Sequence, residues 1–312
     1  MTSMVLGLLL RAVIVLFAAA LVTFTLLWNA PGDPALAIAM ARYNALVPED
    51  VLAQIRAEAG LDAGFWAAFR TWFGPLLLGD FGNSSVTGRA VWPELVTAMS
   101  YTLPLALLGL AIGSAISVPM AILATLRPSG WLDRCAVALA SLGAAIPAYW
   151  LGLLLILLFA VKLAWLPAMG ARTPAHVILP ALTLGLGVAA ALTRIIRSGI
   201  LEAREQPFLP ALRRRGVPER QIGRDHVAPH AAIPVVTVFG LELAFLLEGA
   251  VMVEVIFARP GLGSFLVNAI EARDFPKVQA VVVLAALLFV TINLLIDVVY
   301  RVIDPRIGER DA

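Results

Sequence analysis

Three carboxylates interrupt an apolar stretch at about residues 233–257. They are Glu242, Glu248 and Glu254. An ionisable group inside a membrane is costly and often marks a substrate or proton path. At 100° per residue, a spacing of six points successive glutamates about 120° apart around a helix, so one narrow path can be lined by at most two of them. We take Glu242 and Glu248 as candidate path residues, against the alternative that a neighbouring helix or subunit satisfies each carboxylate.

A second polar set lies on the last apolar stretch. Asn293, Asp297, Tyr300 and Asp304 follow an i, i+4, i+7, i+11 pattern, which places them on one stripe of a helix. Such a stripe should face protein rather than lipid. Hydrogen bonding between helices is one interpretation, and a gate at the end of a transport path, with Asn293 and Asp297 as path residues, is the other.

Other chemistry is poorly supported. His226 and His230 have a spacing that could bind a metal on a helix, but no cysteine or third histidine lies nearby, so we expect no metal site. The single cysteine, Cys135, excludes an intramolecular disulfide. The two lysines, Lys162 and Lys277, do not follow a glycine. A phosphate-binding loop requires Gly-Lys-Ser/Thr, so the chain is not itself a P-loop ATPase.

The elements that position these residues are membrane helices. Of the 312 residues, 61% are hydrophobic and only 14% are charged, far from the quarter charged that is usual in soluble proteins. Because about 20 apolar residues cross a bilayer as a helix, we predict six spans. They cover residues 12–32, 95–126, 135–161, 173–193, roughly 233–257 and 278–296. The fifth, with its glutamates, would depend on neighbouring helices. The first is expected to be an uncleaved helix.

Arginines predict the orientation of these spans. Eight of them lie between residues 194 and 234, at positions 194, 197, 204, 213, 214, 215, 220 and 224. By the positive-inside rule, this loop and both termini are cytoplasmic. Arg194, Arg197 and Arg204 are interpreted mainly as topological anchors. The small net charge of +2 gives no reason to expect nucleic acid.

The segment 33–94 is then extracytoplasmic. We expect short amphipathic helices at Glu49–Gly60 and Phe65–Phe73, in a small domain that rests on the membrane surface through its tryptophans. A packed connector and a docking or gating element are both open interpretations. The expected domains are therefore a first helix at 1–32, this segment at 33–94 and a five-helix core at 95–312.

Within the arginine-rich loop, prolines set the boundaries. Pro207 and Pro210 end the preceding helix, and Gly216 followed by Pro218 restarts one. We predict a short helix at about 218–228, closed by Pro229. Ile222 and His226 share one face of it, too little apolar area to fold alone, so such a helix should dock in a groove on another protein.

A series of distinct short motifs extends along nearly the whole chain. They are Pro31-Gly32-Asp33-Pro34, Gly79-Asp80-Phe81-Gly82, Thr87-Gly88-Arg89, Trp131-Leu132-Asp133-Arg134, Ile146-Pro147, Tyr149-Trp150-Leu151-Gly152, Trp165-Leu166-Pro167-Ala168-Met169-Gly170, Leu179-Pro180-Ala181, Arg259-Pro260-Gly261-Leu262-Gly263, Arg273-Asp274-Phe275-Pro276 and Asp304-Pro305-Arg306. In this order and spacing the chain resembles the permease subunits of bacterial ATP-binding cassette importers for dipeptides, oligopeptides and nickel.

The resemblance implies an all-α, polytopic inner-membrane protein with the six-helix fold of type I importers. It implies that the segment at about 202–234 is a coupling loop that docks an ATPase. Gly216 and Pro229 match the glycine and proline of the general importer signature, while Pro210-Ala211-Leu212 departs from its leading triplet. The coupling residues it implies are Arg213, Arg215, Gly216, Pro218, Ile222, His226 and Pro229.

The implied partners are a second, homologous permease, two cytoplasmic ATPase subunits that bind ATP and magnesium, and an extracytoplasmic substrate-binding protein. This chain would hold no cofactor, and would move peptides, nickel or metal chelates by alternating access. Glu242 and Glu248 favour a cationic or metal-complexed cargo. The alternative function is an ion-coupled secondary transporter, in which Glu242 or Glu248 carries protons and no ATPase is needed.

Overall fold

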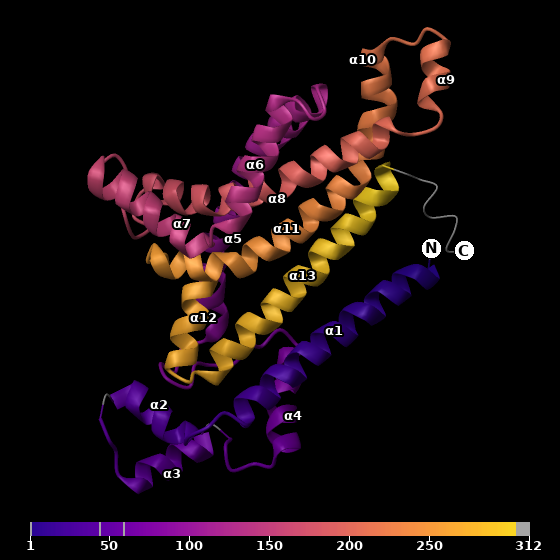
Figure 1. Ribbon diagram of the computed structural model, residues 1–312. Coiled ribbons are helices and arrows are strands. Elements are labelled where there is room, and N and C mark those ends of the chain that lie inside the picture. Colours follow the sequence, from indigo (N-terminus) through magenta and orange to yellow (C-terminus); the bar gives the residue numbers. More distant parts are fainter. Residues whose placement is uncertain (1, 44, 59, 304–312) are drawn as a thin grey trace. The chain divides into compact units, whose positions relative to one another are not determined.

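The computed structural model describes residues 2–43, 45–58 and 60–303 (Figure 1). Over these ranges the chain is helical, apart from its connections and one isolated bridge between Asn83 and Ala90. The α-helices are α1 (Thr2–Trp28), α2 (Pro34–Tyr43), α3 (Glu49–Glu58), α4 (Phe65–Leu76), α5 (Val91–Leu126), α6 (Trp131–Ala145), α7 (Ala148–Leu155), α8 (Ile178–Arg204), α9 (Leu209–Arg214), α10 (Glu219–Ile222), α11 (Ala228–Ile256), α12 (Leu262–Glu271) and α13 (Phe275–Ile303). Two π-helical turns, Ile156–Lys162 and Gly223–Val227, and one 3₁₀ turn, Pro174–Val177, complete them.

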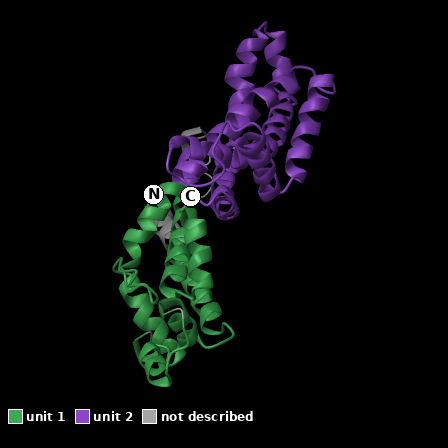
Figure 2. Cartoon of the chain, turned by 90° about the vertical axis from the view of Figure 1, so that its left-hand side faces the viewer, with its two compact units in different colours: residues 1–102, 260–291 green, residues 103–259, 292–312 purple. Residues whose placement is uncertain are grey.

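The chain divides into two compact units (Figure 2). Unit 1 comprises Met1–Thr102 and Pro260–Thr291, and unit 2 comprises Leu103–Arg259 and Ile292–Ala312. Helices α5 and α13 each begin in unit 1 and end in unit 2.

In unit 1, the helices α2 and α3 pack on each other through a small apolar core that includes Ile38 and Ile55. Asp33 begins α2, because its carboxylate accepts the N–H of Ala35 at 2.9 Å, as an N-terminal capping residue does. The guanidinium of Arg56 then binds Asp33 at 2.6 Å. Helix α3 confirms the amphipathic helix expected at Glu49–Gly60, and α4 confirms the one expected at Phe65–Phe73.

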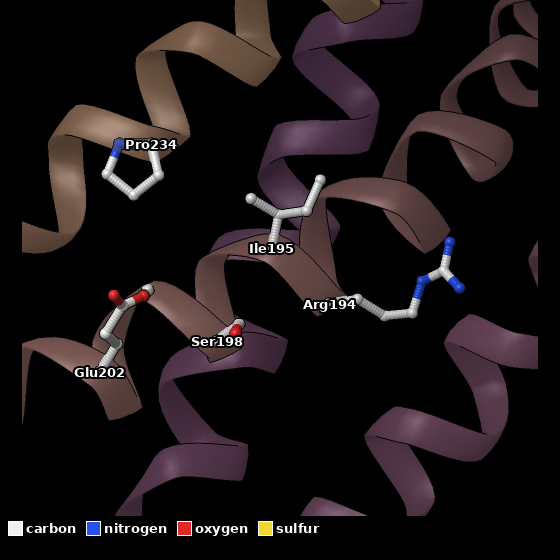
Figure 3. Close-up of a pocket in the computed structure, with 6 residues that line it drawn as sticks. Arg194, Ile195, Ser198, Glu202 and Pro234 are labelled. Carbon is white, nitrogen blue, oxygen red and sulfur yellow. The ribbon is translucent and has the colours of Figure 1, made fainter.

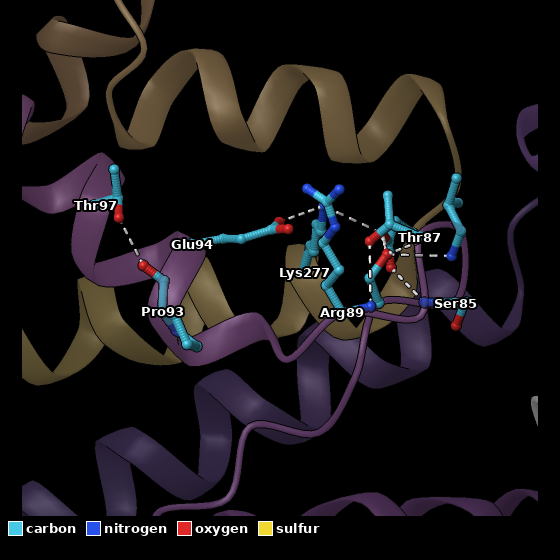
Figure 4. A network of polar contacts seen from close by, with 10 residues as sticks. Ser85, Thr87, Arg89, Pro93, Glu94, Thr97 and Lys277 are labelled. Atoms are coloured by element: carbon cyan, nitrogen blue, oxygen red, sulfur yellow. Dashed lines mark hydrogen bonds and ion pairs between the residues drawn. The ribbon is translucent and has the colours of Figure 1, made fainter.

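A polar network joins the connection before α5 to the start of α13, also within unit 1 (Figure 4). The carboxylate of Asp274 accepts hydrogen bonds from the hydroxyl of Ser84 and, at 3.0 Å, from the N–H of Ser85. The ammonium of Lys277 lies 2.7 Å from Glu94. These contacts link segments almost 190 residues apart and fix where α5 and α13 begin.

In unit 2, the core lies mainly between α5, α8 and α11 and contains Leu105, Leu192 and Val253. Glycines allow the helices to approach closely. A Cβ at Gly113 of α5 would lie 2.5 Å from Val188 of α8, and one at Gly240 of α11 would overlap the side chain of Ile296 of α13. Small residues at such crossings are typical of membrane helices, whose association depends on close packing.

In the part of the chain that the structure describes, four helices are long and apolar enough to cross a membrane: Val91–Leu126, Pro174–Arg204, Pro234–Ile256 and Phe275–Val299. The predicted spans at 95–126, 173–193, 233–257 and 278–296 each fall on one of them. The bent pair α6 and α7 supplies a fifth if it is one span. Helix α1 contributes the shorter apolar segment Ala12–Trp28. The count of six spans stays a prediction.

The structure corrects two details of this pattern. The stretch 135–161 is not one straight helix, because it bends by 98° between α6 and α7. Pro147 causes the break: its backbone is extended, with ψ of 137°, and a proline disfavours helical geometry at the preceding residue. The prediction also missed the short helix α12, whose ten residues are too few to show in a search for spans.

Candidate functional site

The arginine-rich loop is a folded helical hairpin at the end of α8 and α11 (Figure 1). Helices α9 and α10 enclose a small apolar core of Ala203, Leu209, Ile222, Val227 and Ala231. Leu209 and Ile222 are almost fully buried, at 0% and 1% exposed. Ile222, which was expected to lie on a docking face, is therefore covered by the hairpin's own residues.

Gly216 forms the turn of this hairpin. Its φ is +78°, the left-handed conformation that glycine adopts without a steric penalty. The N–H of Gly216 donates to the carbonyl of Arg213 at 3.0 Å, and the N–H of Val217 donates to that of Leu212 at 3.2 Å. This pair of bonds is the Schellman arrangement that ends a helix. Pro218, with extended backbone, then begins α10.

An ion pair between two exposed side chains connects the two sides of this turn. The guanidinium of Arg213 lies 2.6 Å from the carboxylate of Glu219, and this hydrogen bond holds the pKa of Glu219 below its usual value. Arg214, Arg215 and Arg220 are exposed around the pair. The tip of the hairpin thus presents a basic surface on a defined backbone.

Pro229 does not close the helix, which corrects the predicted boundary. Helix α10, the π turn Gly223–Val227 and α11 follow one another without a break. The N–H of Ala228 donates to the carbonyl of Gly223, five residues back, and this wider turn accommodates a proline in the first turn of α11. The hairpin is consequently continuous with a membrane helix.

His226 and His230 both contact Phe208, with ring centroids 6.0 and 5.3 Å apart. The ring N–H of His230 lies 2.8 Å from the carbonyl of His226. His226 is half-buried and His230 is exposed. Both imidazoles therefore pack on the connection that follows α8, where they stabilise the base of the hairpin.

Above that base, α8 and α11 border a cavity of about 450 Å³. It is lined by Arg194, Ile195, Ser198, Gly199, Glu202 and Pro234 (Figure 3). Arg194 and Glu202 are both exposed, so the cavity offers charges of both signs next to the hairpin.

Two arginines of α8 have specific partners that the sequence did not indicate. Arg197 binds the buried carboxylate of Asp133 on α6 through two bonds of 2.5 and 2.8 Å. Arg204 donates to the carbonyl of Thr125 in α5. Besides any role in orientation, these arginines tie α8 to α6 and α5. Asp133 stood inside a recognised motif, but nothing in its spacing identified a partner 64 residues away.

The candidate path residues have different surroundings. Glu242 is half-buried, Glu248 is exposed and Glu254 is fully buried, as their angular spacing on one helix predicts. Asn293 and Asp297 are half-buried on α13. The side chain of Tyr300, and Asp304 altogether, lie outside the described residues.

Comparison with known proteins matches this arrangement to transport subunits. The family described as "binding-protein-dependent transport system inner membrane component" matches residues 117–309, and its N-terminal family matches residues 1–106. The glutathione transport system permease protein GsiC of Salmonella paratyphi A is 38% identical over 307 residues, 98% of this chain and 99% of that protein. GsiC of Escherichia coli K12 is 37% identical over 292 residues, 94% of each.

Solved structures agree on the fold. A structure of the MetNI methionine ABC transporter aligns with a TM-score of 0.56 and 23% identity, over 67% of this chain and 95% of that chain. A structure of an amino acid ABC transporter aligns with a TM-score of 0.55 and 19% identity, over 67% of this chain and 94% of that chain.

The fold and the matches define a class: an all-helical, multi-pass transport subunit of the inner membrane with the type I importer fold. The chain belongs to the family of binding-protein-dependent transport system inner membrane components. It is a permease subunit of an ATP-binding cassette importer. Such subunits are not ATPases themselves, and the family implies an ATPase and a substrate-binding protein as partners.

Proposed function

We propose that this permease imports glutathione or a peptide of similar size. The observation that carries the proposal is the 38% identity with GsiC across 98% of the chain and 99% of that relative. Nickel and metal chelates are the other cargoes that the sequence suggested. Mass spectrometry of the ligand retained by the partner binding protein distinguishes them: a glutathione-like peptide supports the proposal, and a metal complex contradicts it.

The hairpin between α8 and α11 is the proposed docking site for the ATPase. Arg213, Arg215 and Pro218 are exposed on its tip, while Ile222 is buried in its core. Ile222 therefore acts by holding the shape of the hairpin, not by direct contact with the partner. Gly216 sets the turn, and His226 and Pro229 belong to its base. ATP and magnesium would bind to the partner subunits.

Continuity of the helices makes the hairpin a lever. Since α10 continues through the π turn into α11, a displacement of the tip reaches the membrane helix without passing through a flexible linker. The buried core of the hairpin limits how much of that displacement is lost. Closure of two ATPases would move two such levers together and switch the path between its inward-open and outward-open states.

The proposed path lies between this chain and a second, homologous permease. Glu248 is exposed on α11 and Glu242 is half-buried on the same helix, while Asn293 and Asp297 are half-buried on α13. The excess of arginines in the hairpin supports a cytoplasmic position for it and for both termini, with residues 33–94 as an extracytoplasmic segment and 95–312 as the transport core.

Reconstitution tests the coupling proposal. The chain is co-expressed with its partner permease and ATPases, purified, and assayed for ATP hydrolysis with and without the loaded binding protein. We expect the ATPases to co-purify, and the stimulation by binding protein to fall when the hairpin turn is altered. Proton-driven uptake by this chain alone would instead establish the secondary transporter.

A further inference from the structure

Helix α4 itself carries little charge. Residues 63–79 contain one charged side chain, Arg70, and the carboxylates of Asp62 and Asp80 bound this stretch on either side. Trp66 is 66% exposed, and Leu77 and Leu78 just beyond the helix are 71% and 89% exposed. Large apolar side chains are therefore exposed at both ends of α4.

The aromatic contacts show how α4 lies on α1, next to it in Figure 1. Three ring pairs run in order: Phe65 with Trp28 at 5.9 Å, Phe69 with Phe24 at 5.3 Å, and Phe73 with Phe17 at 5.6 Å. The two helices are therefore antiparallel. From Trp28 back to Phe17, α1 rises about 16 Å, which is roughly half of a hydrocarbon core of about 30 Å.

The backbone N–H groups that immediately follow α4 are all hydrogen-bonded. The N–H groups of Leu77, Leu78, Gly79 and Asp80 all donate to carbonyls of the last turn, at 2.9–3.3 Å. Gly79, with φ of +82°, makes this compact reversal possible. A backbone that lies at membrane depth needs such partners, because no water is present to supply them.

Arg70 suits the same environment. It is exposed, and the structure gives it no ion-pair partner among the described residues. It lies five residues beyond Phe65, about 8 Å along the helix. An arginine at that depth can extend its side chain to the headgroups while its methylenes stay in the apolar layer.

We propose that α4 is a re-entrant helix that enters the leaflet in which α1 ends. Its exposed side contacts acyl chains, Trp66 lies at the interface, and the guanidinium of Arg70 binds a lipid phosphate. This differs from a domain that rests on the membrane surface. The inference uses only the membership of α1 in a membrane permease, and neither the proposed cargo nor the proposed role of the hairpin.

Spin labels measure the depth directly. In a Cys135→Ser background, labels are placed at Ala67, Thr71 and Gly74, which are exposed on one face of α4. Exposed alanines of α3, Ala53 and Ala57, serve as controls. The assembled importer is placed in nanodiscs of phosphatidylethanolamine and phosphatidylglycerol. We expect collisions with oxygen to exceed those with a nickel chelate on α4, increasingly from 67 to 74, and the reverse on α3.

Two results would overturn the inference. Labels on α4 that favour the nickel chelate, as those on α3 do, would place the helix in water. Immobilised labels that neither reagent reaches would show that protein, such as the second permease, covers this face. Both readings are independent of transport, so they separate this inference from the proposed function.

Discussion

Gly216 and Gly223 differ in backbone conformation but not in the space around them. A Cβ at either position meets no atom within 4 Å, yet only Gly216 has a positive φ, +78°; Gly223 has φ of −60°. Gly216→Ala should strain the turn by about 1 kcal/mol, whereas Gly223→Ala should be neutral or slightly stabilising.

If the hairpin docks the ATPase, Gly216→Ala lowers the stimulation of hydrolysis by loaded binding protein several-fold, with normal amounts of chain in the membrane. Gly223→Ala keeps the stimulation. Equal effects of the two variants would mean that the geometry of this turn does not matter for coupling.

The pair formed by Asp133 and Arg197 predicts an asymmetric response. The side chain of Asp133 is 5% exposed and that of Arg197 is 26% exposed. Arg197→Met leaves a buried carboxylate without its cation, which costs about 3 kcal/mol, while the double variant with Asp133→Asn should regain much of that loss. Thermal unfolding of the purified permease measures it. Additive losses would show that the contact contributes nothing.

At the scale of elements, hydropathy located most of the helices, because long charge-free runs have few other stable structures. The break at Pro147 and the passage of the helix through Pro229 were harder to predict. Proline interrupts the helical stretch at Pro147 but lies in the first turn of α11 at Pro229. The packing around each proline decides which of the two occurs. The burial of Ile222 and the pairing of Asp133 depend on contacts distant in sequence, which no spacing rule contains.

The α2–α3 element predicts a pH dependence. The hydrogen bond from Arg56 holds the pKa of Asp33 below its usual range. Because the pKa of Asp33 is lower in the folded chain, its ionised carboxylate contributes its full stabilisation at pH values above the pKa of the unfolded chain, about 3.9. This stabilisation is lost as the pH falls through the lower pKa of the folded chain. Cleavage of residues 34–58 by pepsin should therefore increase as the pH falls below about 4.

Comparing each variant with the native chain at the same pH cancels the pH dependence of pepsin's own activity. Arg56→Gln should be cleaved readily already near pH 5, so its profile is flatter than that of the native chain. Arg70→Gln, in the same unit, should behave like the native chain. Identical profiles for the native chain and Arg56→Gln would show that the ion pair does not hold this element.

At the scale of the whole molecule, the direction in which KM changes when path glutamates are neutralised indicates the charge of the transported substrate. If Glu242 and Glu248 line the path, changing both to Gln removes negative charge worth about 1 kcal/mol at a distance of about 8 Å. The KM for uptake should fall roughly fivefold for an anionic peptide such as glutathione and rise for a cationic complex. Glu271→Gln on α12 is the control. An unchanged KM would exclude both glutamates from the path.

The central claim is that this chain moves a small peptide with energy that separate ATPase subunits supply. Uptake of radiolabelled glutathione into proteoliposomes that contain the assembled importer and its binding protein tests it most directly. The account predicts uptake that requires ATP and all subunits and is indifferent to a proton gradient. Uptake by this chain alone, driven by a proton gradient without ATP, would contradict it.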